Sequence, residues 1–338
     1  MNVNIQLVCI FIIIEGLFAL TCSVFSLYVF DPLDNSINYY HFIHLSYGIK
    51  PLQTTHKVKI GFVKPTFTDA AYNNKFYIFY YRHLHTPWNV NVTKDLSLLN
   101  SKVSNIQRGS VHNVFALTDL IKHMGGISNR TLSYSLSDID VDKGNIFDNI
   151  NHRPFNLFDI LVLGHQEYVT QQEYNNLKQF VLNGGTIILL DGNVFYAEVK
   201  YFENNNTISL VKGHGWAFNG KTAWRSVGER WANETSQWVG SNYLCYKCIK
   251  LFKNNPFGYL PHEEQYITNP KDKILLNFDP IQLSNAPKPH IDIAIYSLKY
   301  GKGKIISFGI YSDDIIQNKY FDSYFNRLFT QLLESLPL

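Results

Sequence analysis

The stretch Phe158-Asp159-Ile160-Leu161-Val162-Leu163-Gly164-His165-Gln166-Glu167-Tyr168 decides the fold of this chain. Residues 160–163 form a continuous apolar run, which is typical of a parallel strand covered on both faces. The run ends abruptly in a polar turn that carries a histidine and a glutamate. The segment therefore predicts a short buried strand with chemically useful side chains at its end.

A helix and a second strand follow at once. Thr170 and Glu173 have the T-x-x-E spacing of a capping box, which predicts the start of a helix. An apolar stripe runs through residues 174–181, and Gly184-Gly185 ends the helix. Residues 186–190 then form another apolar run that ends in Asp191-Gly192-Asn193. This is a complete βαβ unit, so we expect an α/β domain with a mostly parallel sheet.

The polar residues after the two strands are the candidate site. Ligands of open α/β sheets bind outside the carboxyl ends of the strands, where His165, Glu167 and Asp191 are expected. A histidine and a carboxylate together act as acid and base or as metal ligands. The alternative is structural: Glu167 favours the positive end of the following helix, and His165 caps the turn. Spacing alone leaves both interpretations open.

Several function classes are disfavoured by the sequence. The net charge is +3 and no cluster of lysine or arginine exceeds two residues, which gives no argument for nucleic acid binding. Gly164-His165-Gln166 occupies the turn where a related hydrolase would place its nucleophilic serine or cysteine. No G-x-G-x-x-G follows the first strand, which argues against a dinucleotide site.

The rest of the chain completes the predicted domain, which spans residues 57–335. Strands are predicted at 58–63, 131–134, 291–298 and 304–309, with a hairpin turn at 300–303 between the last two. A turn at 64–68 precedes a helix at 69–82, a loop covers 91–109, and further helices cover 111–123 and 321–336. Residues 200–270 are rich in tryptophan, glycine and asparagine with poor periodicity. We expect a loop-rich insertion there, packed over one edge of the sheet.

The N-terminus indicates export. Residues 1–26 are almost entirely apolar and resemble a signal peptide, with an uncleaved membrane anchor as the alternative, and residues 27–56 form an irregular lead-in. We therefore expect an extracellular or cell-surface protein that meets a membrane only through an uncleaved N-terminal segment. Glycosylation sequons agree with export and begin at Asn91, Asn129, Asn205 and Asn233.

Two cysteines remain beyond the leader, Cys245 and Cys248, in a C-x-x-C motif. In an exported protein this motif most simply forms a local disulfide. Free thiols, or use in metal binding or redox chemistry, are the alternatives, although only isolated histidines such as His214 and His262 could complete a zinc site.

Residues 160–200 resemble the C-terminal domain of the β subunit of N,N-dimethylformamidase and its relatives. The family shows a G-H-D-E-Y-type motif after a strand, then a helix, then G-G-x-hydrophobic-G-N and aromatics. The matching residues are Gly164, His165, Glu167, Tyr168, Gly184, Gly185, Gly192, Asn193, Phe195 and Tyr196. The residues from Gly301 to Gly309 also resemble the last hairpin of the family. The resemblance implies a class I glutamine-amidotransferase-like (flavodoxin-like) sandwich without that family's cysteine.

The resemblance also implies an iron site. In the amidase a mononuclear iron is bound by tyrosine and glutamate with a histidine nearby, so Glu167 matches the glutamate ligand and His165 the histidine. Tyrosine ligands are taken by position from upstream, with Tyr80 and Tyr81 chosen and Tyr72 and Tyr77 as further candidates. Two positions depart from the pattern, because Gln166 replaces aspartate and Val169 replaces a common tryptophan.

Two functions follow from these observations. The first is an exported hydrolase of the C–N bonds of small amides that depends on iron or another divalent metal, with Glu167 as ligand and His165 as proton shuttle. The second is a non-catalytic surface protein that binds a glycan or a protein partner through the same pocket or through residues 213–240.

Overall fold

The chain divides into two units, Met1–Thr55 and His56–Leu338. The computed structural model describes residues 57–72, 75–85, 89–103, 131–150, 153–190, 192–219, 221–225, 229–243, 265–267, 273–277, 293–308 and 327. In the first unit it describes the backbone of four short strands, β1 (Ile10–Ile14), β2 (Leu17–Thr21), β3 (Val29–Phe30) and β4 (Ile37–Asn38), which pair as two antiparallel hairpins. No described helix has the length and apolar character needed to span a membrane.

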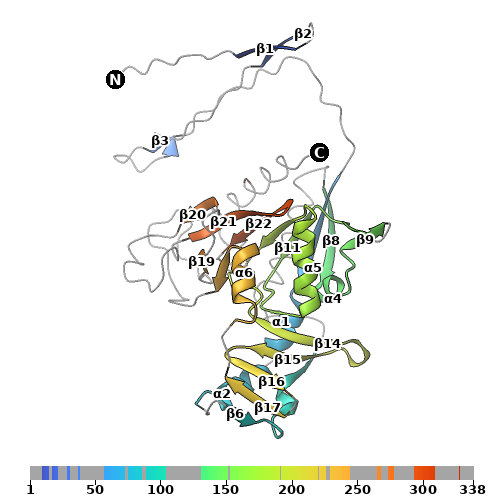
Figure 1. Cartoon of the computed structure of the whole chain (residues 1–338), viewed down its shortest axis with the longest axis vertical. Coiled ribbons are helices and arrows are strands. Elements are labelled where there is room, and N and C mark those ends of the chain that lie inside the picture. The colour runs from blue at the N-terminus through green and yellow to red at the C-terminus, as the bar shows by residue number, and fades with distance from the viewer. Residues whose placement is uncertain are drawn as a thin grey trace. The chain divides into compact units, whose positions relative to one another are not determined.

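A mostly parallel sheet forms the first layer of the second unit (Figure 1). Its strands lie in the order β20-β21-β22-β13-β11-β5-β8. Their bounds are β20 Lys273–Asn277, β21 Ile293–Tyr300, β22 Gly303–Phe308, β13 Thr186–Leu189, β11 Ile160–Leu163, β5 Val58–Lys64 and β8 Thr131–Ser137. The five strands from β22 to β8 are parallel to one another, whereas β21 and β20 are antiparallel. Numbered along the chain, the parallel strands follow the order 2-1-3-4-5 of a doubly wound sheet.

The predicted βαβ unit is confirmed. All four residues of β11 are buried, and the strand pairs with β5 on one side and β13 on the other. Helix α5 (Gln171–Leu182) joins β11 to β13, and the Thr170 hydroxyl accepts the Glu173 N–H at 2.9 Å as an N-cap. The predicted hairpin between β21 and β22 is also confirmed, with Tyr300 opposite Gly303.

The region after β5 contains two helices where one was predicted. Helix α1 (Thr66–Tyr72) begins immediately after Pro65, and α2 (Lys75–Arg82) follows. The predicted turn at 64–68 is therefore wrong for its second half. The backbone N–H groups at the start of α1 are hydrogen-bonded. The Asp69 N–H donates to the Pro65 carbonyl, and the Phe67 N–H donates to an Asp138 carboxylate oxygen at 2.6 Å.

Strands of a second sheet occupy part of the loop-rich insertion predicted at 200–270. Its strand order is β12-β14-β15-β16-β17-β6, with β7 paired to β15. The bounds are β12 Tyr168–Val169, β14 Ala197–Phe202, β15 Thr207–Gly213, β16 Trp216–Asn219, β17 Thr222–Arg225, β6 Asn89–Asn91 and β7 Asn100–Lys102. Strand β7 also lies in the predicted loop at 91–109, and β6 ends at the first residue of that range. These strands were not predicted from the sequence: β15 alternates largely between buried and half-exposed residues, a period of two that the glycine and tryptophan content of the region obscured.

The other described elements of the second unit are shorter. They are η1 (Leu96–Leu99), α4 (Asp138–Asp142), β9 (Phe147–Ile150), β10 (Arg153–Asn156), η2 (Glu203–Asn205), α6 (Ala232–Trp238), β18 (Ser241–Tyr243) and β19 (Gln265–Ile267). The predicted helices at 111–123 and 321–336 lie outside the described residues, apart from Arg327, which is helical.

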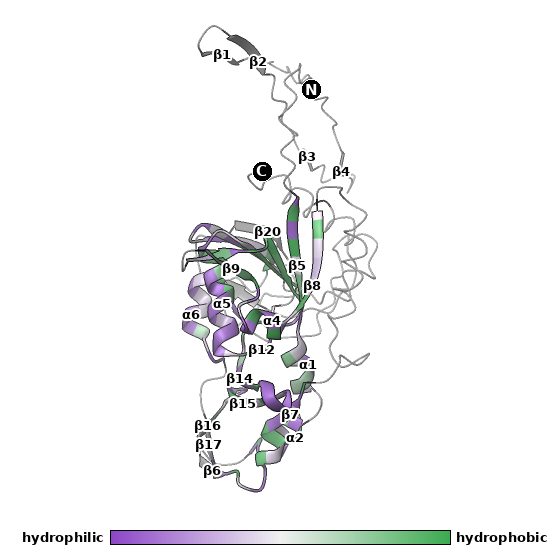
Figure 2. Ribbon diagram, turned by 90° about the vertical axis from the view of Figure 1, so that its right-hand side faces the viewer, coloured by the Kyte–Doolittle hydropathy of each residue, from purple (hydrophilic) through white to green (hydrophobic). Residues whose placement is uncertain are grey.

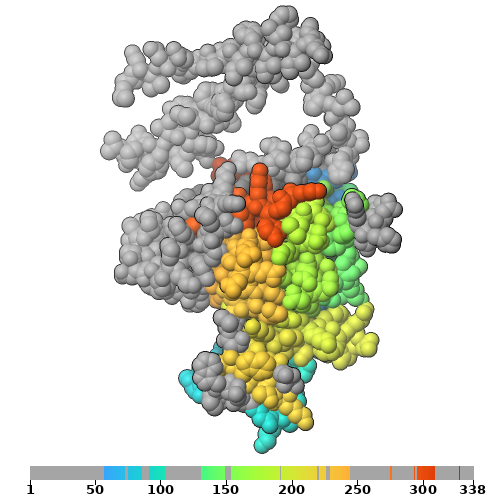
Figure 3. Space-filling model, viewed as in Figure 1, coloured from blue at the N-terminus to red at the C-terminus, as the bar shows by residue number. Residues whose placement is uncertain are grey.

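The two larger hydrophobic clusters in the described part of the second unit lie on different elements. One packs α5 and α6 against β11, β13 and β22, and the other packs α1 and α2 against the second sheet. Strand β5 is largely green in Figure 2, whereas α5 and α6 are largely purple. Helices α5 and α6 lie side by side on the face seen in Figure 3, where the Tyr174 and Thr235 hydroxyls are 3.1 Å apart.

We expect Leu161→Ala to lower the free energy of unfolding by about 2–5 kcal/mol, because a fully buried side chain in an interior strand leaves a cavity. Denaturant unfolding measures this loss. Leu157→Ala is the control, because that side chain is 37% exposed, and its cost should stay below about 1 kcal/mol. Equal losses in the two variants would contradict the placement of β11 inside the sheet.

Candidate functional site

The site is built around the carboxylate of Glu167, which is fully buried. Glu167 lies in the short link between β11 and β12, where the chain passes from the first sheet to the second. Its carbonyl accepts the Ala197 N–H of β14 at 2.9 Å, which fixes this link to the second sheet. Both predicted residues after β11, His165 and Glu167, thus lie at the carboxyl end of an interior strand.

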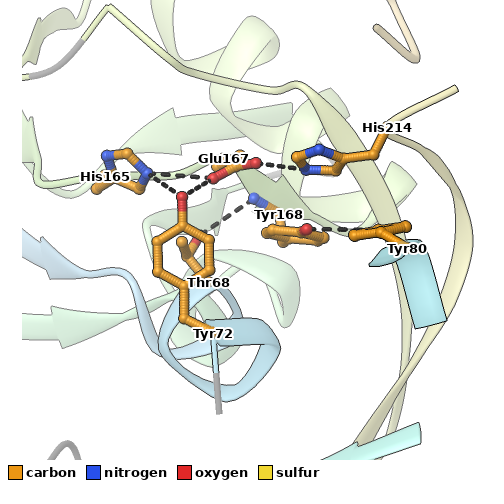
Figure 4. A network of polar contacts seen from close by, with 7 residues as sticks. All are labelled: Thr68, Tyr72, Tyr80, His165, Glu167, Tyr168 and His214. Atoms are coloured by element: carbon orange, nitrogen blue, oxygen red, sulfur yellow. Dashed lines mark hydrogen bonds and ion pairs between the residues drawn. The ribbon is translucent and has the colours of Figure 1, made fainter. Parts of the chain in front are cut away.

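Three side chains from three elements contact the carboxylate (Figure 4). The Tyr72 hydroxyl, from the end of α1, donates to Oε2. His165 Nε2 lies 3.3 Å from the same oxygen and 3.2 Å from the Tyr72 hydroxyl. His214 Nε2, from the turn between β15 and β16, lies 2.6 Å from Oε1. With Glu167 ionised, His214 is the donor in this contact.

Neighbouring histidines stabilise the ionised form of Glu167. Burial by itself raises the pKa of the carboxyl, but His214 and then His165 outweigh burial and hold the pKa well below its usual range. A carboxylate with such a low pKa is a weak base. Its chemistry is therefore that of an anion or a ligand.

A layer of phenols surrounds the carboxylate. Burial, followed by the negative charge of Glu167, raises the pKa of the Tyr72 and Tyr77 hydroxyls well above the usual value. The Tyr77 ring packs edge-on against the Tyr72 ring at 5.2 Å between centroids, and the hydroxyls of Tyr80 and Tyr168 lie 3.4 Å apart. Burial likewise raises the pKa of Tyr80 and Tyr168. The site thus presents neutral hydroxyl groups to a single negative charge.

Helix α1 is fixed at three points. Asp138 accepts the Phe67 N–H at its start, the Thr68 hydroxyl accepts the Tyr168 N–H at 3.1 Å, and Tyr72 contacts Glu167 at its end. Gln166 supports the first point by donating to Asp138 Oδ1 at 3.2 Å and to the Val63 carbonyl at 3.1 Å. Burial raises the pKa of Asp138 to about 7, although its hydrogen bonds act in the opposite direction. The end of α1 is therefore placed by contacts along its whole length.

The two tyrosines predicted as ligands, Tyr80 and Tyr81, differ in burial. Tyr80 is buried, and its ring packs on the His214 ring at 4.7 Å between centroids. Tyr81 is 73% exposed, and its ring packs on the Tyr77 ring, so its role as a ligand stays a prediction. Tyr72, named only as a further candidate, is the tyrosine that contacts Glu167, because α1 ends beside β12.

Sequence reasoning missed the role of His214. The available signal was a histidine between two glycines, Gly213 and Gly215, in a region that was expected to be a loop. Of the other predicted site residues, Asp191, Cys245, Cys248 and Asn129 lie outside the described residues. Asn193, after β13, is buried.

The chain belongs to the family described as N,N-dimethylformamidase beta subunit-like, C-terminal, whose sequence model matches residues 16–267. This family is the one that the residues after β11 resemble. No curated protein matches the chain.

Solved structures are similar only at a distance. A GH42 beta-galactosidase from G. stearothermophilus is 12% identical with a TM-score of 0.38, and the match covers 68% of this chain and 27% of that enzyme. A cytoplasmic protein from Salmonella typhimurium LT2 is 10% identical with a TM-score of 0.39, and the match covers 81% of this chain and 99% of that protein. The chain thus spans about a quarter of the galactosidase, and neither likeness bears on its function.

We expect Tyr196→Phe to reduce the loss of stability at high pH. Burial raises the pKa of Tyr196 from 10.0 to about 12, so the unfolded chain releases this proton first. The stabilising contribution is fully present below pH 10 and is lost as pH rises through about 12. Unfolding temperatures across this range should fall less steeply in the variant than in the wild type. Parallel curves for the two proteins would contradict this pKa.

Proposed function

We propose that the protein hydrolyses the carbon–nitrogen bond of a small amide at the Glu167 site. The observation that carries the proposal is the meeting of Tyr72 and His165 on one oxygen, Oε2, of a fully buried carboxylate. Membership of the N,N-dimethylformamidase beta subunit-like family supports amide chemistry at this position.

A metal ion, iron by family resemblance or another divalent ion, is part of the proposal, and the donor set fits it. No group of three or more histidine, cysteine, aspartate or glutamate side chains in the described parts of the chain is arranged to hold a metal. A metal at Glu167 would therefore need tyrosine oxygens, and Tyr72 and Tyr77 supply them beside the carboxylate. Carboxylate and phenolate oxygens suit a hard ion. When bound, the ion would supply Lewis-acid polarisation of an amide carbonyl.

The side chains around this position have separate roles. His165 lies within reach of both the Tyr72 hydroxyl and Glu167 Oε2, so it is placed to hold or pass a proton between the site and a substrate. Tyr80 and Tyr168 keep their protons because of burial, and they offer a hydroxyl donor to a polar guest. Burial of Glu167 excludes water from the carboxylate, which strengthens every electrostatic contact made there.

We also infer that the first sheet is the class I glutamine-amidotransferase-like, flavodoxin-like core that the resemblance implies. The strand order 2-1-3-4-5 supports this assignment. In this order the crevice for ligands lies between the first and third strands, β5 and β11. Tyr72 and Glu167 follow these two strands, which is consistent with a site at the reversal of strand order.

We expect Glu167→Gln to abolish metal binding and amidase activity, because the amide removes the carboxylate ligand. His165→Ala should lower turnover more than metal content, because it removes the proton carrier and keeps the ligands. Metal analysis of protein purified without chelators, together with the visible charge-transfer colour of tyrosine bound to ferric iron, measures the first effect. Glu234→Gln is the matched control, because that side chain is 41% exposed on α6 and pairs with Lys178.

Wild-type protein that stays metal-free after iron is supplied, and that hydrolyses no small amide, would contradict the proposal. That result would favour a non-catalytic protein that binds a glycan or a protein partner.

Export is the second part of the proposal. Three of the four sequon asparagines, Asn91, Asn205 and Asn233, are exposed, as a glycosylation acceptor requires. We expect protein from a secreting eukaryotic host to lose mass on treatment with an N-glycosidase. The triple variant with glutamine at these positions should lose only what Asn129 carries. Secreted protein whose mass does not change would contradict this assignment.

A further inference from the structure

The turn that carries His214 has an unusual backbone. Gly213, His214 and Gly215 have φ angles of +156°, +50° and +79°, so three successive residues lie in the region that disfavours side chains. A histidine is kept in a conformation that glycine or asparagine adopts more easily. Strain of this kind persists where the surrounding structure enforces it, which often occurs at functional sites.

The turn is pressed against the strand that fixes Glu167. A Cβ on Gly213 would lie 2.3 Å from the Cβ of Ala197, so only glycine permits this approach. Ala197 in turn donates its N–H to the Glu167 carbonyl. The backbone of β14 at Ala197 thus contacts both the His214 turn and Glu167, and it fixes the position of both.

Aromatic rings fix the orientation of the imidazole. The His214 ring stacks on Tyr168 with 5.5 Å between centroids and an interplanar angle of 20°. It also packs against Tyr80 and against the edge of Tyr196, each at 4.7 Å. Rings on several sides leave the imidazole with little freedom to turn. Its Nε2 is therefore directed at one atom, Oε1 of Glu167.

We infer that His214 is a positioning residue that holds Oε1 of Glu167 and thereby reserves Oε2 for a metal ion or substrate. The two oxygens are treated differently, because Oε1 meets His214 whereas Oε2 meets Tyr72 and His165. Partners of this kind fix the orientation of a metal-binding carboxylate. The inference rests on the proposed function for the occupant of Oε2, whereas the orientation of the carboxylate stands on geometry alone.

Two substitutions distinguish a His214 that orients the Glu167 carboxylate from a His214 that only satisfies the left-handed turn. His214→Gln keeps an N–H donor at about the reach of Nε2, although it does not favour the left-handed backbone. His214→Asn favours that backbone but is too short to reach Oε1. With positioning, the glutamine variant should keep ferric iron affinity within about threefold, and the asparagine variant should lose about 10- to 100-fold. If the turn alone matters, asparagine will match the wild type or exceed glutamine, and the inference is overturned.

A metal-free readout tests the inference even if iron does not bind. In protein with carbon-13-labelled tyrosine, the ring signals of Tyr72 should shift in His214→Asn, because the freed carboxylate changes its contact with the Tyr72 hydroxyl. They should return toward the wild-type position in His214→Gln. Asn206→Gly is the control, since Asn206 is a left-handed residue in the neighbouring β14–β15 connection, away from Glu167.

Unchanged Tyr72 signals in His214→Asn would overturn the inference. Wild-type protein that binds no iron would count against the proposed function alone, and the tyrosine signals would then decide the role of His214.

Discussion

A single ionised carboxylate, buried where two sheets meet, is the constraint on which the rest of the structure depends. An isolated charge in a protein interior is costly unless hydrogen bonds and opposite charge compensate it. Glu167 receives its partners from α1, from the link after β11 and from the β15–β16 turn. Each of these elements must be in place for the charge to be tolerated. The carboxylate therefore ties the first sheet, the second sheet and α1 into one arrangement.

The hydrogen bonds that hold α1 in place explain why this chain has glutamine at position 166, where the family pattern has aspartate. Its amide nitrogen donates to Asp138, and Asp138 in turn accepts the Phe67 N–H in the first turn of α1. An aspartate at 166 would place a second carboxylate against Asp138, whose pKa is already raised by burial. Glu173, also buried beside Asp138, has its pKa raised by burial and by Asp138. The amide thus supplies a donor where a further negative charge would be unfavourable.

The sequence predicted the first sheet around the βαβ unit well, because β11 and β13 are continuous apolar runs and α5 begins with an N-cap. It also predicted that His165 and Glu167 share one end of the sheet. The second sheet was missed, because its strands alternate over short stretches rich in glycine and tryptophan. His214 and the contact of Tyr72 depend on that sheet and on the break between α1 and α2. Contacts across 47 and 95 residues of sequence leave no local pattern from which to infer them.

The proposed cation at Oε2 would change the electrostatics of the site. His214 and His165 lower the pKa of Glu167, which favours its ionised form, and we assign proton transfer to His165. The same charge raises the pKa of Tyr72 and Tyr77 and keeps their protons in place. A cation beside Oε2 would reverse that effect, because it would neutralise Glu167 and stabilise phenolate at once. The carboxylate and the phenols then become ligands of one centre. This coupling is the physical argument behind the cation in the proposed function.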